Sequence, residues 1–68
     1  MIKIDSDFVT LGQFLKMTDW ISSGGEAKFA VKNLSITVNG IKEERRGRKL
    51  YDGDKICIED KNYTIEHV

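Results

Sequence analysis

Four cations within five residues form the strongest chemical signal in this 68-residue chain, at Arg45-Arg46-Gly47-Arg48-Lys49. Arginine suits phosphate because its planar guanidinium donates paired hydrogen bonds and stays charged, and Gly47 would let the backbone approach a ligand closely. Short basic runs also occur as solvated surface, and the acidic residues directly before this run, Glu43 and Glu44, could pair with it. The run alone therefore leaves two hypotheses open, a phosphate-binding loop and a solvated charged loop.

Two lysines and a glycine pair upstream could extend such a loop. Lys28 and Lys32 lie four residues apart on one stripe of an expected helix. Gly24-Gly25 would leave backbone N–H groups bare at the positively polarised start of that helix, where phosphates bind readily. Taken singly, the two lysines are better explained as solvent-exposed surface residues, and the two glycines as a simple connection between helices. The basic run, the lysines and the glycine pair lie in neighbouring elements, and all three suit phosphate. Together they favour an anion-binding surface.

The charge of the chain is zero in sum but uneven along the sequence. Residues 1–27 carry a net −2, residues 28–49 carry +5 and residues 50–68 carry −3. Screening over about 8 to 10 Å hides distant acids from a bound phosphate, so a local basic surface can attract an anionic partner despite the neutral total. Neutrality therefore does not exclude a nucleic acid as partner.

Little else in the chain suggests chemistry. Cys57 lies between Ile56 and Ile58 on an expected strand, and a plain sheet cysteine is favoured over a catalytic pair with His67. One cysteine and one histidine cannot supply the usual ligand set of a metal site. We expect no enzymatic activity, no metal and no cofactor. Four aromatic side chains could stack on bases, but their spacing favours core positions: Phe14, Trp20, Phe29 and Tyr63.

The length of the chain predicts a single domain over residues 1–68 with a thin core and no deep active site. No apolar run approaches the roughly 18 residues of a membrane span, and no secretory pattern opens the chain. A lone cysteine cannot form an internal disulfide, so we expect the protein in the reducing cytoplasm. We also expect a monomer.

Two short helices are expected to position the first half of the basic surface. Thr10 and Gln13 form a capping box, which predicts a helix over about residues 11–21. Ser23 and Glu26 repeat the same pattern before a second helix. Its apolar residues recur at helical spacing and form one face: Ala27, Ala30, Val31 and Leu34.

The remaining sequence predicts strands. Residues 1–4 alternate like a short opening strand, Asn39-Gly40 is a strong hairpin signal, and Lys61-Asn62 is expected to turn the chain before a final strand. Together these elements predict an α+β fold, in which a helix-turn-helix-like αα corner packs on a small antiparallel sheet of about three to five strands.

Four ordered segments together carry a family resemblance: Ser23 to Lys28 (SGGEAK), Ser35 to Gly40 (SITVNG), Arg45 to Lys49 (RRGRK) and Asp52 to Ile58 (DGDKICI). This series resembles the RNA-binding domain named after small-subunit ribosomal protein four. FVTLGQFLK and RRGRKL resemble, more narrowly, its small stand-alone YaaA-type members. The resemblance covers roughly residues 8 to 59 and is fairly specific, although V-N-G or G-D alone would be weak.

The resemblance implies a module that binds structured RNA through the two helices and the basic loop. Where many relatives carry R-L-D and further arginines, this chain has T-L-G and S-G-G-E, which suggests that backbone amides replace side-chain contacts there. The positions that the resemblance and these amides assign to RNA binding are Thr10, Gln13, Ser23, Gly25, Lys28, Lys32, Arg45, Arg46, Arg48 and Lys49.

We therefore expect a non-enzymatic module that recognises folded RNA by shape and phosphate positions. The resemblance makes ribosomal RNA or a ribosomal subunit the expected partner, in ribosome assembly or translation, with no membrane and no small-molecule substrate. The alternative is a protein-interaction adaptor whose basic loop docks an acidic partner. A ubiquitin-like sulfur carrier is disfavoured, because such carriers need a C-terminal Gly-Gly and this sequence closes on Glu66-His67-Val68.

Overall fold

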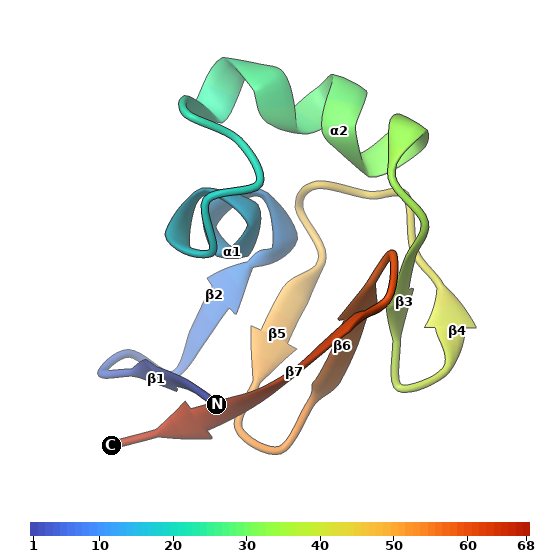
Figure 1. Cartoon of the computed structure of the whole chain (residues 1–68). Coiled ribbons are helices and arrows are strands. Elements are labelled where there is room, and N and C mark those ends of the chain that lie inside the picture. Colours follow the sequence, from blue (N-terminus) through green and yellow to red (C-terminus); the bar gives the residue numbers. More distant parts are fainter.

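The computed structural model of residues 1–68 combines two short α-helices with seven strands (Figure 1). This confirms the predicted α+β class. In chain order the elements are β1 (Ile2–Ile4), β2 (Phe8–Thr10), α1 (Leu11–Met17), the 3-10 turn η1 (Gly24–Glu26), α2 (Ala27–Asn33), β3 (Ile36–Val38), β4 (Ile41–Lys42), β5 (Lys49–Tyr51), β6 (Lys55–Ile58) and β7 (Lys61–His67).

The strands form two sheets, and the larger one is mixed rather than antiparallel. Its order is β1-β7-β6-β3-β4, and β1 runs parallel to β7 with Ile2 opposite Ile65. The expectation of an antiparallel sheet is therefore wrong for this pair, because alternation of apolar residues marks a strand but is the same for either direction. The second sheet pairs β2 with β5 in antiparallel fashion, and β2 was not expected as a strand.

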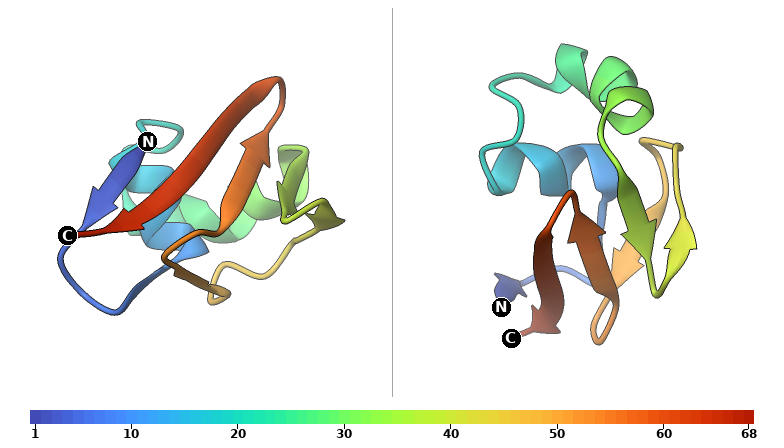
Figure 2. Two further views of the ribbon diagram at one scale, coloured as in Figure 1. Left: turned by 90° about the horizontal axis from the view of Figure 1, so that it is seen from below. Right: turned by 45° about the vertical axis from the view of Figure 1, so that its right-hand side comes forward.

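Both helices lie at one end of the strands, and the two termini lie close together away from α2 (Figure 2). Helix α1 ends at Met17 instead of near residue 21. The Trp20 N–H donates to the Leu15 carbonyl at 2.9 Å and the Asp19 N–H to the Lys16 carbonyl at 3.2 Å, the paired bonds of a Schellman ending. Asp19 takes the left-handed conformation, with φ 64°, in which glycine is the usual residue, so this helix end lacks the glycine that would have marked it in the sequence.

The predicted Asn39-Gly40 hairpin is confirmed. Their φ angles of 53° and 84° are both positive, as the favoured two-residue turn requires. The last turn lies two residues earlier than expected, because β7 already begins at Lys61 and the turn is made by Glu59 and Asp60. Glu59 has φ 54° and receives the Ser35 N–H at 2.6 Å on its carboxylate, which ties this turn to the start of β3.

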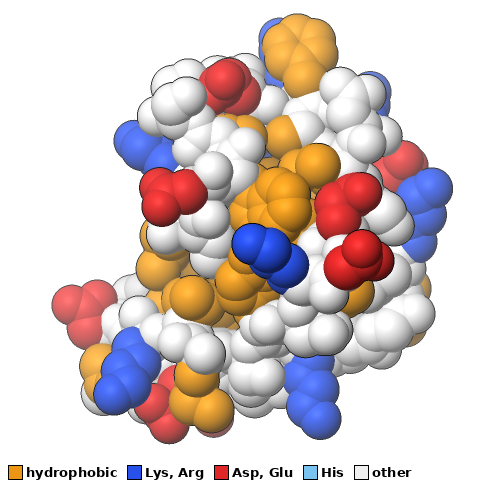
Figure 3. All heavy atoms as spheres, in the orientation of Figure 1, with side chains coloured by type: hydrophobic (Ala, Val, Ile, Leu, Met, Phe, Trp, Pro, Cys, Tyr) orange, Lys and Arg blue, Asp and Glu red, His pale blue; other side chains and the backbone are white.

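The apolar core lies between the helices and the sheets, and Figure 3 shows hydrophobic side chains gathered in the middle of one face. Trp20 closes one side of this core: its indole N–H donates to the Tyr63 hydroxyl at 3.0 Å, and Tyr63 packs edge-on against Phe14. No helix has the length and apolar character needed to cross a membrane. The buried apolar residues are Ile4, Val9, Leu11, Phe14, Leu15, Ile21, Ala27, Val31, Ile36, Val38, Leu50, Ile56, Ile58 and Ile65.

Candidate nucleic-acid interface

The loop between β4 and β5, residues 43–48, is fastened to the first turn of α1. The Leu11 N–H donates to the Arg48 carbonyl at 2.8 Å, and the Gly12 N–H donates to the Arg46 carbonyl at 2.9 Å. The first N–H groups of a helix have no partner within the helix, so the loop carbonyls satisfy two of them. This docking holds the basic loop in one place relative to α1.

Thr10 and Gln13 complete the same helix start. The Thr10 hydroxyl receives the Gln13 N–H at 3.2 Å, and the Gln13 side-chain oxygen receives the Thr10 N–H at 2.9 Å. The predicted capping box is thus confirmed. The N–H groups at the start of α1 are already bonded within the protein, so the Gln13 side-chain amide NH₂ is the donor left here for a ligand.

Gly12 lets three elements meet at this point. A Cβ at position 12 would lie 3.3 Å from the Ala27 Cβ of α2 and 3.5 Å from the Arg46 carbonyl oxygen of the loop. Ala27 is itself buried, so it has little room to give way. The close approach of α1, α2 and the loop therefore depends on the missing side chain at Gly12.

Glu43 is buried beneath the basic loop and forms hydrogen bonds with several of its groups. It is the one buried polar or charged residue of the chain, with 5% of its surface exposed. Its carboxylate receives five hydrogen bonds, from the backbone N–H groups of Glu44 and Arg45, from two side-chain nitrogens of Arg45 and from Arg48 Nη1 at 2.7 Å. Two of the three cations in the loop are thus paired with one internal carboxylate.

These contacts favour the ionised form of Glu43. Side-chain hydrogen bonds from Arg45, together with those from Arg48 and the Arg45 backbone, outweigh burial and lower the pKa of Glu43 from 4.5 to about 2. The carboxylate therefore remains charged throughout the physiological range, and the loop keeps its internal counterion.

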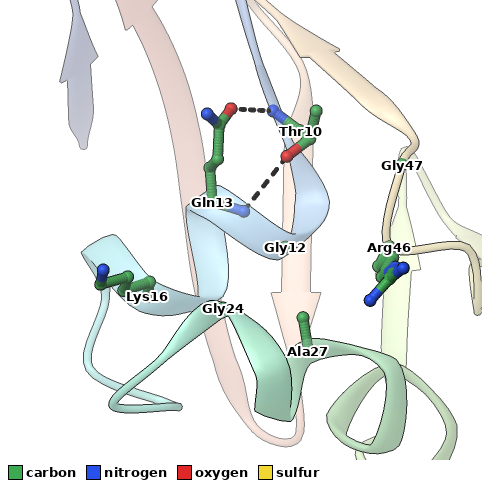
Figure 4. Close-up of a pocket in the computed structure, with 8 residues that line it drawn as sticks. All are labelled: Thr10, Gly12, Gln13, Lys16, Gly24, Ala27, Arg46 and Gly47. Carbon is green, nitrogen blue, oxygen red and sulfur yellow. Dashed lines mark hydrogen bonds between the residues drawn. The ribbon is translucent and has the colours of Figure 1, made fainter.

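A pocket of about 410 Å³ opens where α1, η1 and the loop converge. Figure 4 shows Lys16 of α1 and Arg46 of the loop on opposite sides of this pocket, with Gly12 and Gly24 between them. Both cationic side chains are exposed to solvent. The pocket thus has one positive charge on each side, Lys16 and Arg46, and glycine backbone between them. This arrangement suits an anionic group.

The chain contains three ion pairs: Lys42 with Glu44, Arg45 with Glu43, and Arg48 with Glu43. The cations around the pocket and along α2 therefore have no carboxylate partner. Lys49 is also without one, but its Nζ lies 4.9 Å from the ring centre of Phe8. The unpaired cations of this surface are Lys16, Lys28, Lys32, Arg46 and Lys49.

The turn before α2 is held by its own acid. The Glu26 carboxylate receives the backbone N–H groups of Ser23 at 2.9 Å and Ser22 at 2.7 Å, and these bonds lower its pKa. The predicted pairing of Ser23 with Glu26 is thereby confirmed on the glutamate side. Gly24 lines the pocket, whereas Gly25 does not; a Cβ at either glycine would meet nothing within 4 Å.

Two residues of this region, Lys16 and Gly12, are not among the positions predicted from the sequence. Lys16 follows Gln13 by three positions, which places both on one stripe of α1, and that spacing was the available signal. A glycine inside a helix often marks a close packing contact, and Gly12 is such a case. Cys57 is half-buried with its Sγ 3.3 Å from the Glu59 carbonyl, consistent with a sheet cysteine, and no cluster of potential metal ligands forms.

Comparison with known proteins identifies the family. The family model described as the S4 domain matches residues 2–66. A protein of Bacillus subtilis (strain 168) named "Probable ribosome maturation protein RlbA" is 52% identical over 58 residues, which cover 85% of this chain and 82% of that protein. No solved structure matches the chain. The resemblance read from the four sequence segments is confirmed, and the chain belongs to the S4 domain family.

Proposed function

We propose that residues 1–68 form one non-enzymatic domain that binds structured ribosomal RNA during ribosome maturation in the cytoplasm. Its membership of the S4 domain family and its similarity to a protein named for ribosome maturation support this function. The observation that carries the proposal is the docking of the basic loop on α1, which places Arg46 and Lys16 in the lining of one pocket.

The predicted phosphate contacts divide into two roles. Arg46 and Lys16 bind phosphate at the pocket, and Lys28 and Lys32 extend the contact along α2. Arg45 and Arg48 hold the loop in shape through Glu43. The Arg45 side chain is 77% exposed and keeps donor groups for RNA as well, so it contributes to both roles.

The remaining predicted positions either lie beside the main phosphate contacts or shape the backbone around them. Gln13 offers its side-chain amide beside the pocket, and Lys49 adds charge at its outer edge. Thr10 and Ser23 shape the starts of the helices, and Gly25 keeps the approach to α2 open. Such a surface reads phosphate positions and backbone shape instead of base sequence.

Salt dependence tests the phosphate contacts. Four phosphates neutralised by the unpaired cations of α1, α2 and the loop give a log–log slope of affinity against salt of roughly −3. Replacing Lys16 and Arg46 by alanine should make this slope shallower by roughly 1.5, measured by fluorescence anisotropy with deproteinised ribosomal RNA. The double variant of Lys3 and Lys61 removes the same charge from exposed positions elsewhere and should leave the slope nearly unchanged. Affinity that does not respond to salt contradicts the proposal.

Crosslinking in intact cells separates RNA binding from the adaptor alternative. Direct RNA adducts on residues 28–49 are expected if the protein contacts RNA itself. Association with ribosomal particles through protein crosslinks alone, with no RNA adduct in this segment, contradicts direct binding and supports an adaptor.

A further inference from the structure

The outward surface of α2 carries an exposed aromatic ring beside unpaired cations. Phe29 is 61% exposed, more than any other aromatic residue of the chain. Lys28 Nζ lies 5.1 Å from the centre of its ring, and Lys32 follows one helical turn later. Figure 3 shows a hydrophobic side chain projecting from the surface over α2 with a cationic side chain beside it.

The other aromatic residues have partners inside the protein. Phe14 is fully buried, and Trp20 and Tyr63 are joined by the indole hydrogen bond. Phe8 and Tyr51 pack against each other with ring centres 5.9 Å apart. The expectation that Phe29 is a core residue is therefore wrong: most of its surface is exposed, and the neighbouring Lys28 is the one cation that lies near its ring.

Phe29 does little to hold α2 in place. The helix is anchored by Ala27 and Val31, which are 2% exposed, on the opposite side from the ring. Apolar burial stabilises a fold in proportion to the area removed from water, and most of the ring stays in water. Phe29 therefore contributes little to the stability of the fold, and its exposed ring, with two lysines beside it, is available to a partner that carries both an apolar face and negative charge.

We propose that Phe29 stacks on an unpaired RNA base while Lys28 and Lys32 bind the flanking phosphates, an inference that rests on the proposed function. A nucleotide offers both groups that this surface fits, a flat π face and an anionic backbone. The exposed residues of α2 are Lys28, Phe29, Lys32 and Asn33, so no acid opposes a polyanion there. Phe29 therefore directs the domain to RNA that has a single-stranded loop beside a helix.

Two RNA probes and two substitutions test this role. The probes are an RNA hairpin with an unpaired loop and a blunt duplex of the same stem. Phe29→Leu keeps apolar bulk without the aromatic face, and it should weaken hairpin binding by roughly 5-fold to 100-fold while duplex binding changes less than about 2-fold. Phe29→Trp should retain or strengthen hairpin binding. Ile41→Ala is the matched control, since Ile41 is 70% exposed on β4 outside this surface, and it should change neither affinity.

Each outcome decides the proposal. Selective loss with Phe29→Leu and recovery with Phe29→Trp, at an unchanged thermal midpoint, supports stacking. Equal loss on both probes, or no loss on the hairpin, overturns stacking and leaves RNA binding through the lysines intact. Failure of the wild-type protein to bind either probe overturns the proposed function itself. Retention of a Phe29-dependent protein partner after ribonuclease treatment, with no Phe29 effect on RNA, assigns the ring to protein and overturns the proposal.

Discussion

Replacing Glu43 by glutamine tests whether the buried carboxylate positions the basic loop. Glutamine keeps the shape of the side chain, but its amide nitrogen cannot accept a hydrogen bond. Of the five bonds that the carboxylate receives, those that would fall on this nitrogen are lost. The side chains of Arg45 and Arg48 then have no charged partner, and the loop loses its counterion.

The lowered pKa of Glu43 sets the size of the stability effect. At about 1.4 kcal/mol per pH unit, lowering the pKa from 4.5 to about 2 corresponds to at most about 3.5 kcal/mol. Arg45 is 77% exposed, so water screens part of this interaction, and we expect a loss of about 2 kcal/mol at neutral pH. For a domain of this size that is a drop of roughly 10 °C in the unfolding midpoint, measurable by circular dichroism.

The pH dependence follows from the direction of the pKa change. A depressed carboxylate pKa stabilises the folded state fully above about pH 4.5, and this stabilisation disappears as the pH falls towards 2. The stability difference between the wild type and Glu43→Gln should therefore shrink between pH 5 and pH 2. A difference that stays constant over this range refutes the assignment.

RNA binding gives the second measurement, with Glu44→Gln as a matched control. Both variants remove one negative charge and so raise the net charge by one. Glu44, however, is 53% exposed, and its one ion pair, with Lys42, is a long contact of 3.9 Å. Simple electrostatics predicts tighter binding for both. If Glu43 positions the loop, Glu43→Gln binds roughly 3-fold to 10-fold more weakly, because the loop must be ordered on binding. Glu43→Gln binding as tightly as Glu44→Gln contradicts a positioning role.

Three further predictions concern the framework of the site. Gly12→Val should destabilise the fold by about 2 kcal/mol in urea unfolding, because its side chain collides with Ala27, whereas Gly25→Ala should be nearly neutral. In an NMR titration, the amide protons that bond to Glu26 should shift with a midpoint below 4.5, since these bonds lower its pKa; a midpoint at or above 4.5 contradicts this. Trp20→Phe removes the indole hydrogen bond to the tyrosine hydroxyl and should cost about 1 kcal/mol in thermal unfolding.

Local sequence signals predicted the local structure well. Thr10 with Gln13 and Asn39 with Gly40 each fix a backbone geometry through residues a few positions apart, and both motifs form as expected. The end of α1 was missed because Asp19 adopts a conformation that the sequence marks clearly only when glycine is present. The direction of β1 was missed because its partner, β7, lies at the other end of the chain.

The sequence predicted which residues carry the positive charge of the candidate site, but not the contacts that hold these residues in place. The sequence shows the positively charged segment and predicts Glu43 as one possible partner for it. The sequence could not show that Glu43 is buried or that the loop carbonyls bond to the start of α1, because both depend on packing between distant elements. A triple charge reversal of Arg45, Arg46 and Arg48 would therefore disturb the loop itself, and a change at Arg46 alone is the cleaner test of binding.

The position of Glu43 changes how the neutral charge of the chain is understood. Four cations in five residues repel one another, and a loop of this kind would be mobile without an internal acid. Glu43 neutralises part of that repulsion beneath the loop, while Arg46 and the lysines of α1 and α2 keep unpaired charges on the surface. The acid thus fixes where the positive charge is presented, instead of cancelling it. Recognition of a folded RNA depends on that fixed spacing, because phosphates in a structured RNA also occupy defined positions.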